Sequence, residues 1–195
     1  NIADFTKANL IGAQLQGANL SRIKVSGGKI NGAKLSRANL TRGKFIKTEM
    51  KDADLSGADL SGADFTEAIL NGTDLSRTNL KEANFTSANA EKTFLIGADL
   101  REGNLQGCRL SDADLSGAKL EKANLKQVQF NGANLHRADL QEADLTQANL
   151  KKANLTGAKL AEASLKNADL TGAVLNQADL GNVNLKDTIG FKATN

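Results

Sequence analysis

Two side chains in the sequence, His136 and Cys108, belong to the types most often used for catalysis or metal binding. Each is the only residue of its type, so the chain has no Cys/His cluster of the kind that holds zinc. A Ser/His/Asp arrangement would need a nucleophile placed beside His136, and nothing in the sequence places one there. We expect His136 to face solvent and Cys108 to be a core residue. The sequence therefore predicts no catalytic, cofactor-binding or metal-binding residue, and a protein that is not an enzyme.

Asparagine and aspartate recur at fixed intervals, and their side chains are the other candidates for a site. Asn84, Asn104 and Asn124, for example, are spaced by twenty residues. Carboxylates in such series can bind cations, but spacing this regular singles out no pocket. Hydrogen bonding to neighbouring turns is the favoured role. The pair Gly27-Gly28 lacks the spacing of a Walker motif, so no phosphate-binding loop is predicted.

Charge is distributed unevenly along the chain. Residues 1–51 contain ten basic and two acidic residues, a net charge of +8, whereas the remainder has fifteen basic and twenty acidic residues, a net charge of −5. We name eight of these basic residues the basic collar: Arg22, Lys24, Lys29, Lys34, Arg37, Arg42, Lys44 and Lys47. One interpretation is a solvated surface that keeps a repetitive protein soluble. The other is a docking surface for an acidic partner, namely a protein, a nucleic acid or an anionic lipid.

Nucleic acid is the least favoured of these partners, because the chain has no Tyr or Trp on which bases could stack. The preferred interpretation is that the partner is a protein, whose identity is unknown. No run of 18 apolar residues is present, so no transmembrane segment is expected.

The elements that carry these residues follow a period of five. Every position divisible by five from Phe5 to Leu185 is apolar, which makes 37 consecutive positions, of which 28 are Leu. We call these the central residues. A small residue, usually Ala, lies two positions earlier, and Asn, Asp or Lys usually lies between the two. The repeating unit is A-(D/N)-L-x-x, as in Ala53-Asp54-Leu55-Ser56-Gly57.

This period fits neither a helix nor a continuous strand. In a helix, five residues advance the apolar position by about 500°, so successive Leu side chains form no stripe. In a strand, the small and central residues share one face, but the next small residue, three positions later, falls on the other face. The chain must therefore turn after every five residues, always with the same hand, and close into a coil.

Four sides of five residues give a coil of 20 residues. Phe5, Phe45, Phe65 and Phe85 then fall in one column, and the columns of Leu15 and Leu20 contain only Leu. Stacked coils are expected to lie about 4.8 Å apart. Most glycines lie two residues after a central residue, where the turn falls. Arg37 shares that position, so we expect that a positive φ is not required there.

The unit and its repetition over residues 3 to about 188 resemble the pentapeptide-repeat family. The resemblance implies an all-β fold, a right-handed quadrilateral β-helix of about 20 residues per coil and roughly nine coils. We expect residues 1–188 to form this single solenoid and residues 189–195 a short C-terminal tail, in which Ile189 and Phe191 could cover the last coil. The chain begins without Met inside the repeat pattern, which indicates an excerpt of a longer protein or a processed form.

Two functional classes follow from the resemblance. The first is a non-enzymatic scaffold or protein-interaction rod, with end-to-end self-association as a further option because a β-helix exposes backbone edges at its ends. The alternative is the DNA-mimicking binding of gyrase or topoisomerase known for the quinolone-resistance members of the family. Those members have acidic surfaces and interrupting loops, whereas this chain is basic overall and has no loops. The family is abundant in cyanobacteria and occurs in the chloroplast lumen, so the resemblance is compatible with a soluble cytoplasmic or lumenal protein of a photosynthetic organism, without assigning a compartment.

Overall fold

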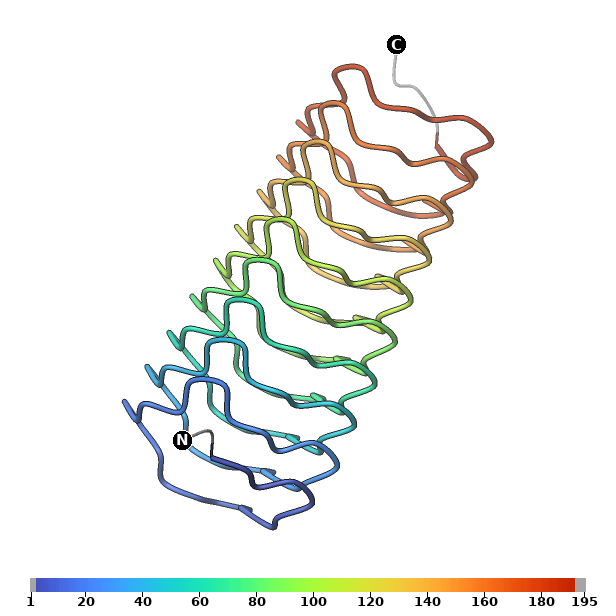
Figure 1. The fold of residues 1–195 in the computed structure, drawn as a ribbon. Coiled ribbons are helices and arrows are strands. Elements are labelled where there is room, and N and C mark those ends of the chain that lie inside the picture. Colours follow the sequence, from blue (N-terminus) through green and yellow to red (C-terminus); the bar gives the residue numbers. More distant parts are fainter. Residues whose placement is uncertain (1–2, 192–195) are drawn as a thin grey trace.

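The structure is a computed structural model that describes residues 3–191, and it shows a rod of stacked coils (Figure 1). In this part of the chain there is no α-helix, and the β-structure consists of single-residue parallel bridges. Each bridge joins a residue to the one twenty positions later, from Asp4–Lys24 through to Asp169–Ile189. The bridged residues, which we call outward residues, directly precede the central residues. The coil therefore has four sides and twenty residues, as predicted.

We number the four sides of the coil by their first outward residues: Asp4 for side one, Asn9 for side two, Gln14 for side three and Asn19 for side four.

None of the described residues belongs to a helix that is long and apolar enough to cross a bilayer.

Hydrogen bonds between coils use most of the backbone of each side. On the side around Leu55, the N–H of Leu55 donates to the carbonyl of Asp74 at 2.8 Å, and the N–H of Gly57 donates to Ser76 at 2.9 Å. The N–H of Asp74 returns a bond to the carbonyl of Ala53 at 2.9 Å. Because these groups are paired with neighbouring coils, the backbone is satisfied by bridges of a single residue, without longer strands.

Each corner of the coil is a β-turn closed by its own hydrogen bond. The N–H of Ala58 donates to the carbonyl of Leu55 at 3.0 Å. The residue two after each central residue, which we call the corner residue, has a positive φ at all 37 corners: 24 are not glycine, such as Arg37 with a φ of 58°. A positive φ at the third residue of a turn is the mark of a type II turn. The expectation that this φ is not required was therefore wrong.

A left-handed conformation costs a residue other than glycine roughly 1–2 kcal/mol. The corner residue adopts it because only that bend returns the next small and central residues to the interior. The corner N–H then reaches the coil above, as Arg37 does with the carbonyl of Ser56 at 3.0 Å. Closure of the coil thus overrides the conformational preference of the residue.

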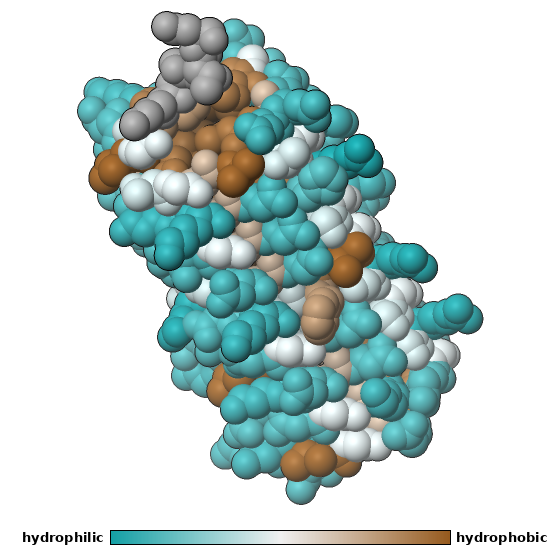
Figure 2. Space-filling view, turned by 180° about the vertical axis from the view of Figure 1, so that it is seen from behind, coloured by the Kyte–Doolittle hydropathy of each residue, from teal (hydrophilic) through white to brown (hydrophobic). Residues whose placement is uncertain are grey.

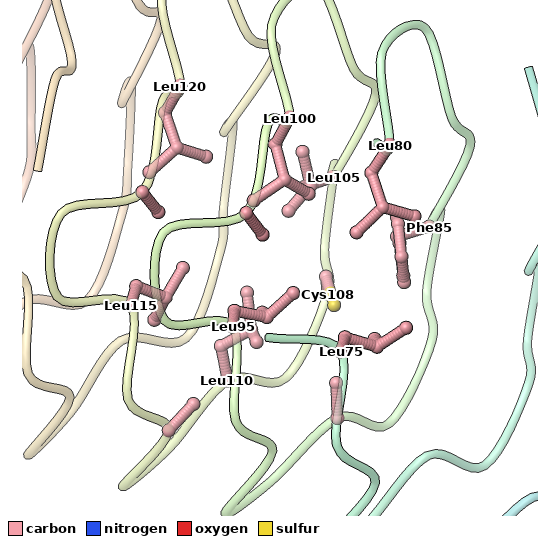
Figure 3. Packing of buried hydrophobic residues seen from close by; sticks show 14 of the residues in the cluster. Leu75, Leu80, Phe85, Leu95, Leu100, Leu105, Cys108, Leu110, Leu115 and Leu120 are labelled. Carbon is pink, nitrogen blue, oxygen red and sulfur yellow. The ribbon is translucent and has the colours of Figure 1, made fainter. Parts of the chain in front are cut away.

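The interior is filled by columns of central residues packed against columns of small ones. Leu75, Leu95 and Leu115 lie above one another, as do Leu80 and Leu100 (Figure 3). The predicted phenylalanine column is also present: the ring centroids of Phe45 and Phe65 are 5.1 Å apart, and those of Phe65 and Phe85 are 4.6 Å apart. Stacking identical residues lets each coil repeat the packing of the last.

The small position adjusts to the size of the central residue. Gly43 lies where a Cβ would come within 2.6 Å of the Phe45 ring, so glycine makes room for that ring. Threonine is accepted at this position when its hydroxyl finds a carbonyl, as Thr73 Oγ1 does by donating to Met50 at 2.7 Å. Cys108 is fully buried in this position, as predicted.

Burial is incomplete at the two ends of the rod. Apolar surface gathers at the C-terminal end (Figure 2), around a hollow of about 840 Å³ lined by Leu175, Leu180 and Phe191. Phe191 packs against the core, but Ile189 bridges to Asp169 and is 58 % exposed. Ile189 therefore continues side two as an outward residue and does not cover the last coil. The rest of the tail, residues 192–195, lies outside the described residues, and the boundary between residues 1–188 and 189–195 stays a prediction.

The central residues should contribute most to stability in the middle of the rod. Leu100→Ala is expected to lower the free energy of unfolding by about 2–5 kcal/mol, because it leaves a cavity between stacked coils. Urea unfolding followed by circular dichroism measures the change. Leu20→Ala is the matched control, since Leu20 lies in the same column but is only partly buried. Equal losses at the two positions would contradict this account of the core.

The energetic penalty of a positive φ should be measurable when a corner glycine is replaced by alanine. Gly117 has a φ of 64° and no atom within 4 Å of the position that a Cβ would take, so Gly117→Ala tests conformation alone. The variant should lose about 1 kcal/mol of stability in urea unfolding. Gly181→Ala is the control, because Gly181 does not have a positive φ. A stabilised Gly117→Ala protein would show that the corner conformation carries no penalty.

Candidate functional site

The basic collar forms a ring around the rod and does not gather on one face. Lys24 and Lys44 are outward residues of side one, and Lys29 and Lys34 are outward residues of sides two and three. The remaining four collar residues, Arg22, Arg37, Arg42 and Lys47, are corner residues. The collar therefore presents positive charge in every direction around the second and third coils. Whether it is a binding site stays a prediction.

Half of the collar is neutralised by acidic residues one coil away. Two of the pairs join Lys24 to Asp4 and Lys29 to Glu49, each at 3.5 Å. The other two join Lys44 to Asp64 at 3.3 Å and Lys47 to Glu67 at 3.4 Å. Both acidic residues lie in the next coil. Ion pairs between side chains this exposed contribute little to stability. Their main consequence is to remove these four cations from the net field of the collar.

The other four collar residues make no ion pair within residues 3–191. They are Arg22, Lys34, Arg37 and Arg42. Three of the four are arginines at corners, where long side chains extend from the rod. The positive field of the collar is thus concentrated on corner guanidinium groups.

His136 follows a central residue, and Cys108 takes a small position in the core. The backbone N–H of His136 donates to Asn134 Oδ1 at 3.2 Å, and the residue is half-buried, whereas the sequence predicts that it faces solvent. Complete burial raises the pKa of the Cys108 thiol to about 12, so this sulfur stays protonated and unreactive at neutral pH. Within the described part of the chain, no group of three or more His, Cys, Asp or Glu residues is placed to hold a metal ion.

The Asn and Asp outward residues complete the backbone hydrogen bonding. Asp54 Oδ1 accepts from the N–H of Ser56 at 3.0 Å, and most outward Asn and Asp residues accept in the same way from the residue two positions on. This N–H is the one backbone N–H of the side that has no backbone acceptor. Bonds between coils are present as well, such as Asn124 Nδ2 to Asn104 Oδ1 at 2.9 Å. The expected bonds to neighbouring turns are therefore joined by bonds within a turn, which the sequence analysis missed.

These contacts lower the pKa of several aspartates. Partial burial acts to raise the pKa of Asp64, but hydrogen bonds from the hydroxyl and N–H of Thr66, together with Lys44, outweigh it and hold that pKa below its usual value. The pKa of Asp144 is lowered by the same balance, with Thr146 as donor. The carboxylate is thus the form that the folded rod prefers.

A groove lies at the corner between sides three and four. Its volume is about 400 Å³, and Arg37, Gly57, Arg77 and Ile96 contribute to its walls. Among these residues, only Arg37 belongs to the basic collar predicted from the sequence. The missed signal is the run Phe94-Leu95-Ile96, in which large apolar residues occupy two positions that are polar in most repeats.

Coils of twenty residues, parallel bridges between successive coils and an interior of stacked Leu define the protein as a β-helical solenoid. A family model described as "Pentapeptide repeats" matches eight copies that together span residues 3–187. The chain therefore belongs to the pentapeptide repeat family, and the predicted right-handed quadrilateral β-helix of roughly nine coils is confirmed.

Solved structures of the family share this fold. HetL, a pentapeptide repeat protein involved in heterocyst differentiation regulation from the cyanobacterium Nostoc sp. strain PCC 7120, superposes with a TM-score of 0.68 at 29% sequence identity, over 100% of this chain and 92% of HetL. A trypsin-treated form of QnrB1, a plasmid-mediated fluoroquinolone resistance protein, has a TM-score of 0.53 at 22% identity, over 83% of this chain and 88% of QnrB1. The likeness to QnrB1 shows the fold alone. No curated protein sequence matches the chain.

The lowered aspartate pKa values predict a loss of stability in acid. A carboxyl whose folded pKa is lowered stabilises the fold above its unfolded pKa of about 3.9, and this stability is lost as the pH falls through the folded value. The pKa of Asp99 is also lowered, chiefly by its hydrogen bond from the Arg101 side chain. The triple variant Asp64→Asn, Asp99→Asn, Asp144→Asn keeps an acceptor oxygen at each position, but its amides do not titrate. Its urea midpoint should fall less than that of the wild type between about pH 5 and pH 2.

The control for this experiment is the triple variant Asp52→Asn, Asp112→Asn, Asp187→Asn, in which the same change is made at three corner residues. It should keep the pH dependence of the wild type. Identical pH profiles for the wild type and the outward-residue variant would contradict the role assigned to these carboxylates.

Proposed function

We propose that the chain is a non-enzymatic protein-interaction scaffold that docks an acidic protein partner through its basic collar. The observation that carries this proposal is the set of corner arginines, Arg22, Arg37 and Arg42, that make no ion pair within residues 3–191. Unpaired guanidinium groups attract carboxylates and form two parallel hydrogen bonds with them.

The rigid rod supports such a role. Coils joined by hydrogen bonds on all four sides hold surface residues at fixed spacing, so a partner meets a preorganised surface and orders little of it on binding. HetL is involved in the regulation of heterocyst differentiation, and its similarity over the whole of this chain favours a regulatory role. The half-buried His136 and the protonated Cys108 thiol offer no support for catalysis.

DNA mimicry with gyrase or topoisomerase as the partner is the less favoured alternative. It requires an acidic surface, and the first 51 residues carry a net charge of +8. A gyrase supercoiling assay tests this alternative directly: inhibition by the purified chain would favour DNA mimicry over the collar.

Reversing two collar charges should weaken binding to an acidic chain. The variant Arg22→Glu, Arg42→Glu is compatible with the corner conformation, because Glu82 and Glu102 occupy the same corner column with φ values of 57° and 59°. Affinity for polyglutamate, measured by isothermal titration calorimetry at low salt, should fall by about tenfold or more.

The matched control is Lys92→Glu, Lys152→Glu, which makes the same change in net charge at two corner residues outside the collar. It should reduce affinity much less. Equal losses for the two variants would show that net charge alone drives binding and would remove the case for the collar. Tighter binding of duplex DNA or of anionic vesicles than of polyglutamate would instead redirect the proposal to those partners.

A further inference from the structure

The groove between sides three and four has the features of a binding site for a protein segment. The corner column that forms its edge runs Gly17, Arg37, Gly57, Arg77, Gly97, so that long side chains alternate with glycine. Gly57 therefore leaves a notch between two arginines. The Arg37 Cγ lies 3.6 Å from the position that a Cβ on Gly57 would take, which shows that the stem of Arg37 leans over this notch.

The groove carries an excess of positive charge. Neither Arg37 nor Arg77 makes an ion pair with any of the described residues. Asp74 also lines the groove, but its Oδ1 already accepts from the N–H of Ser76 at 2.8 Å. Two guanidinium groups thus face one carboxylate, and an acidic ligand would balance them.

Apolar surface continues from the groove on the next coil. Ile96 forms part of its wall and is 40 % exposed, and the neighbouring Phe94, 48 % exposed, bridges to Asp74. Most repeats have a polar residue at these positions. A ligand that covers both side chains would remove apolar surface from water, which is favourable.

The spacing of the arginines indicates the form of the ligand. Arg37 and Arg77 are two coils apart, a rise of about 9.6 Å along the rod at the usual distance between bridged strands. A polyproline II segment has three residues per turn and a rise of 3.1 Å per residue, so residues i and i+3 share one face about 9.3 Å apart.

We propose that this groove binds an extended acidic segment of a protein partner, with two carboxylates three residues apart on Arg37 and Arg77 and an apolar side chain on Phe94 and Ile96. The inference deepens the proposed function and rests on it in part, because Arg37 belongs to the basic collar. It adds Arg77, Phe94 and Ile96, which lie outside the collar, and it specifies the chemistry of the segment that docks.

A defined peptide pair tests the groove. The probe is acetyl-Leu-Pro-Asp-Pro-Pro-Asp-Pro-Leu-amide, which carries an apolar residue at each end so that either direction of binding is served. The control peptide, acetyl-Leu-Pro-Pro-Asp-Asp-Pro-Pro-Leu-amide, has the same composition and net charge but the wrong carboxylate spacing. Binding to the whole chain is followed by changes in the amide NMR spectrum.

The probe should shift the amide signals around residues 56–57, 76–77 and 94–96 and should bind about tenfold more tightly than the control peptide. Arg77→Gln removes one guanidinium group, and Gly57→Gln fills the notch while keeping both arginines. Gln is accepted at these corners, since Gln177 lies in the same column with a φ of 59°. Each variant should weaken binding of the probe by about tenfold.

Arg137→Gln and Gly117→Gln are the matched controls, because they make the same changes in the same corner column away from the groove. They should bind the probe as the wild type does. Equal affinity for the two peptides, shifts located elsewhere, or unchanged binding by Arg77→Gln and Gly57→Gln would each overturn the groove proposal.

The two proposals fail separately. If the groove variants bind the probe normally while Arg22→Glu, Arg42→Glu still weakens polyglutamate binding, the groove is wrong and the collar stands. If the groove variants weaken probe binding while the collar variant binds polyglutamate normally, the groove stands alone as the docking site.

Discussion

The structure depends on one requirement: the backbone N–H groups of each five-residue side need acceptors. Three of the five N–H groups bond to adjacent coils, and a fourth closes the corner turn. The fifth, directly after the central residue, bonds to the outward Asn or Asp on the sides that have one, as in the bond from Ser56 to Asp54. The A-(D/N)-L-x-x unit therefore combines two demands, since its apolar residues fill the interior and its polar residue completes the backbone.

The interior shows how the repeat tolerates exceptions. In the column that begins at Phe5, Val25 is smaller than the phenylalanines on either side of it, and the small position beside it holds the larger Ile23. One coil later, the small position beside Phe45 is Gly43, where the Cβ of any other residue would clash with the phenylalanine ring. Volume is thus conserved over neighbouring coils, and the backbone keeps its twenty-residue path.

The fold could be predicted from sequence because its determinants are periodic: the central residues, the small position and the phenylalanine column each recur at a fixed interval. The corner conformation could not, because Arg, Lys and Glu in that position gave no sign of a positive φ, which closure of the coil imposes. The groove was missed for a related reason. It arises from residues twenty and forty positions apart, Arg37, Gly57 and Arg77, and from the direction in which Arg37 leans.

Parallel bridges at a constant interval of twenty residues make the rod a molecular ruler. Removal or duplication of one whole coil between the groove and the C-terminal end would leave every residue on its original side and change the length by about 4.8 Å. A change of five residues would rotate everything beyond it by one side. Evolution can therefore adjust the distance between two surface features in fixed steps without altering either of them.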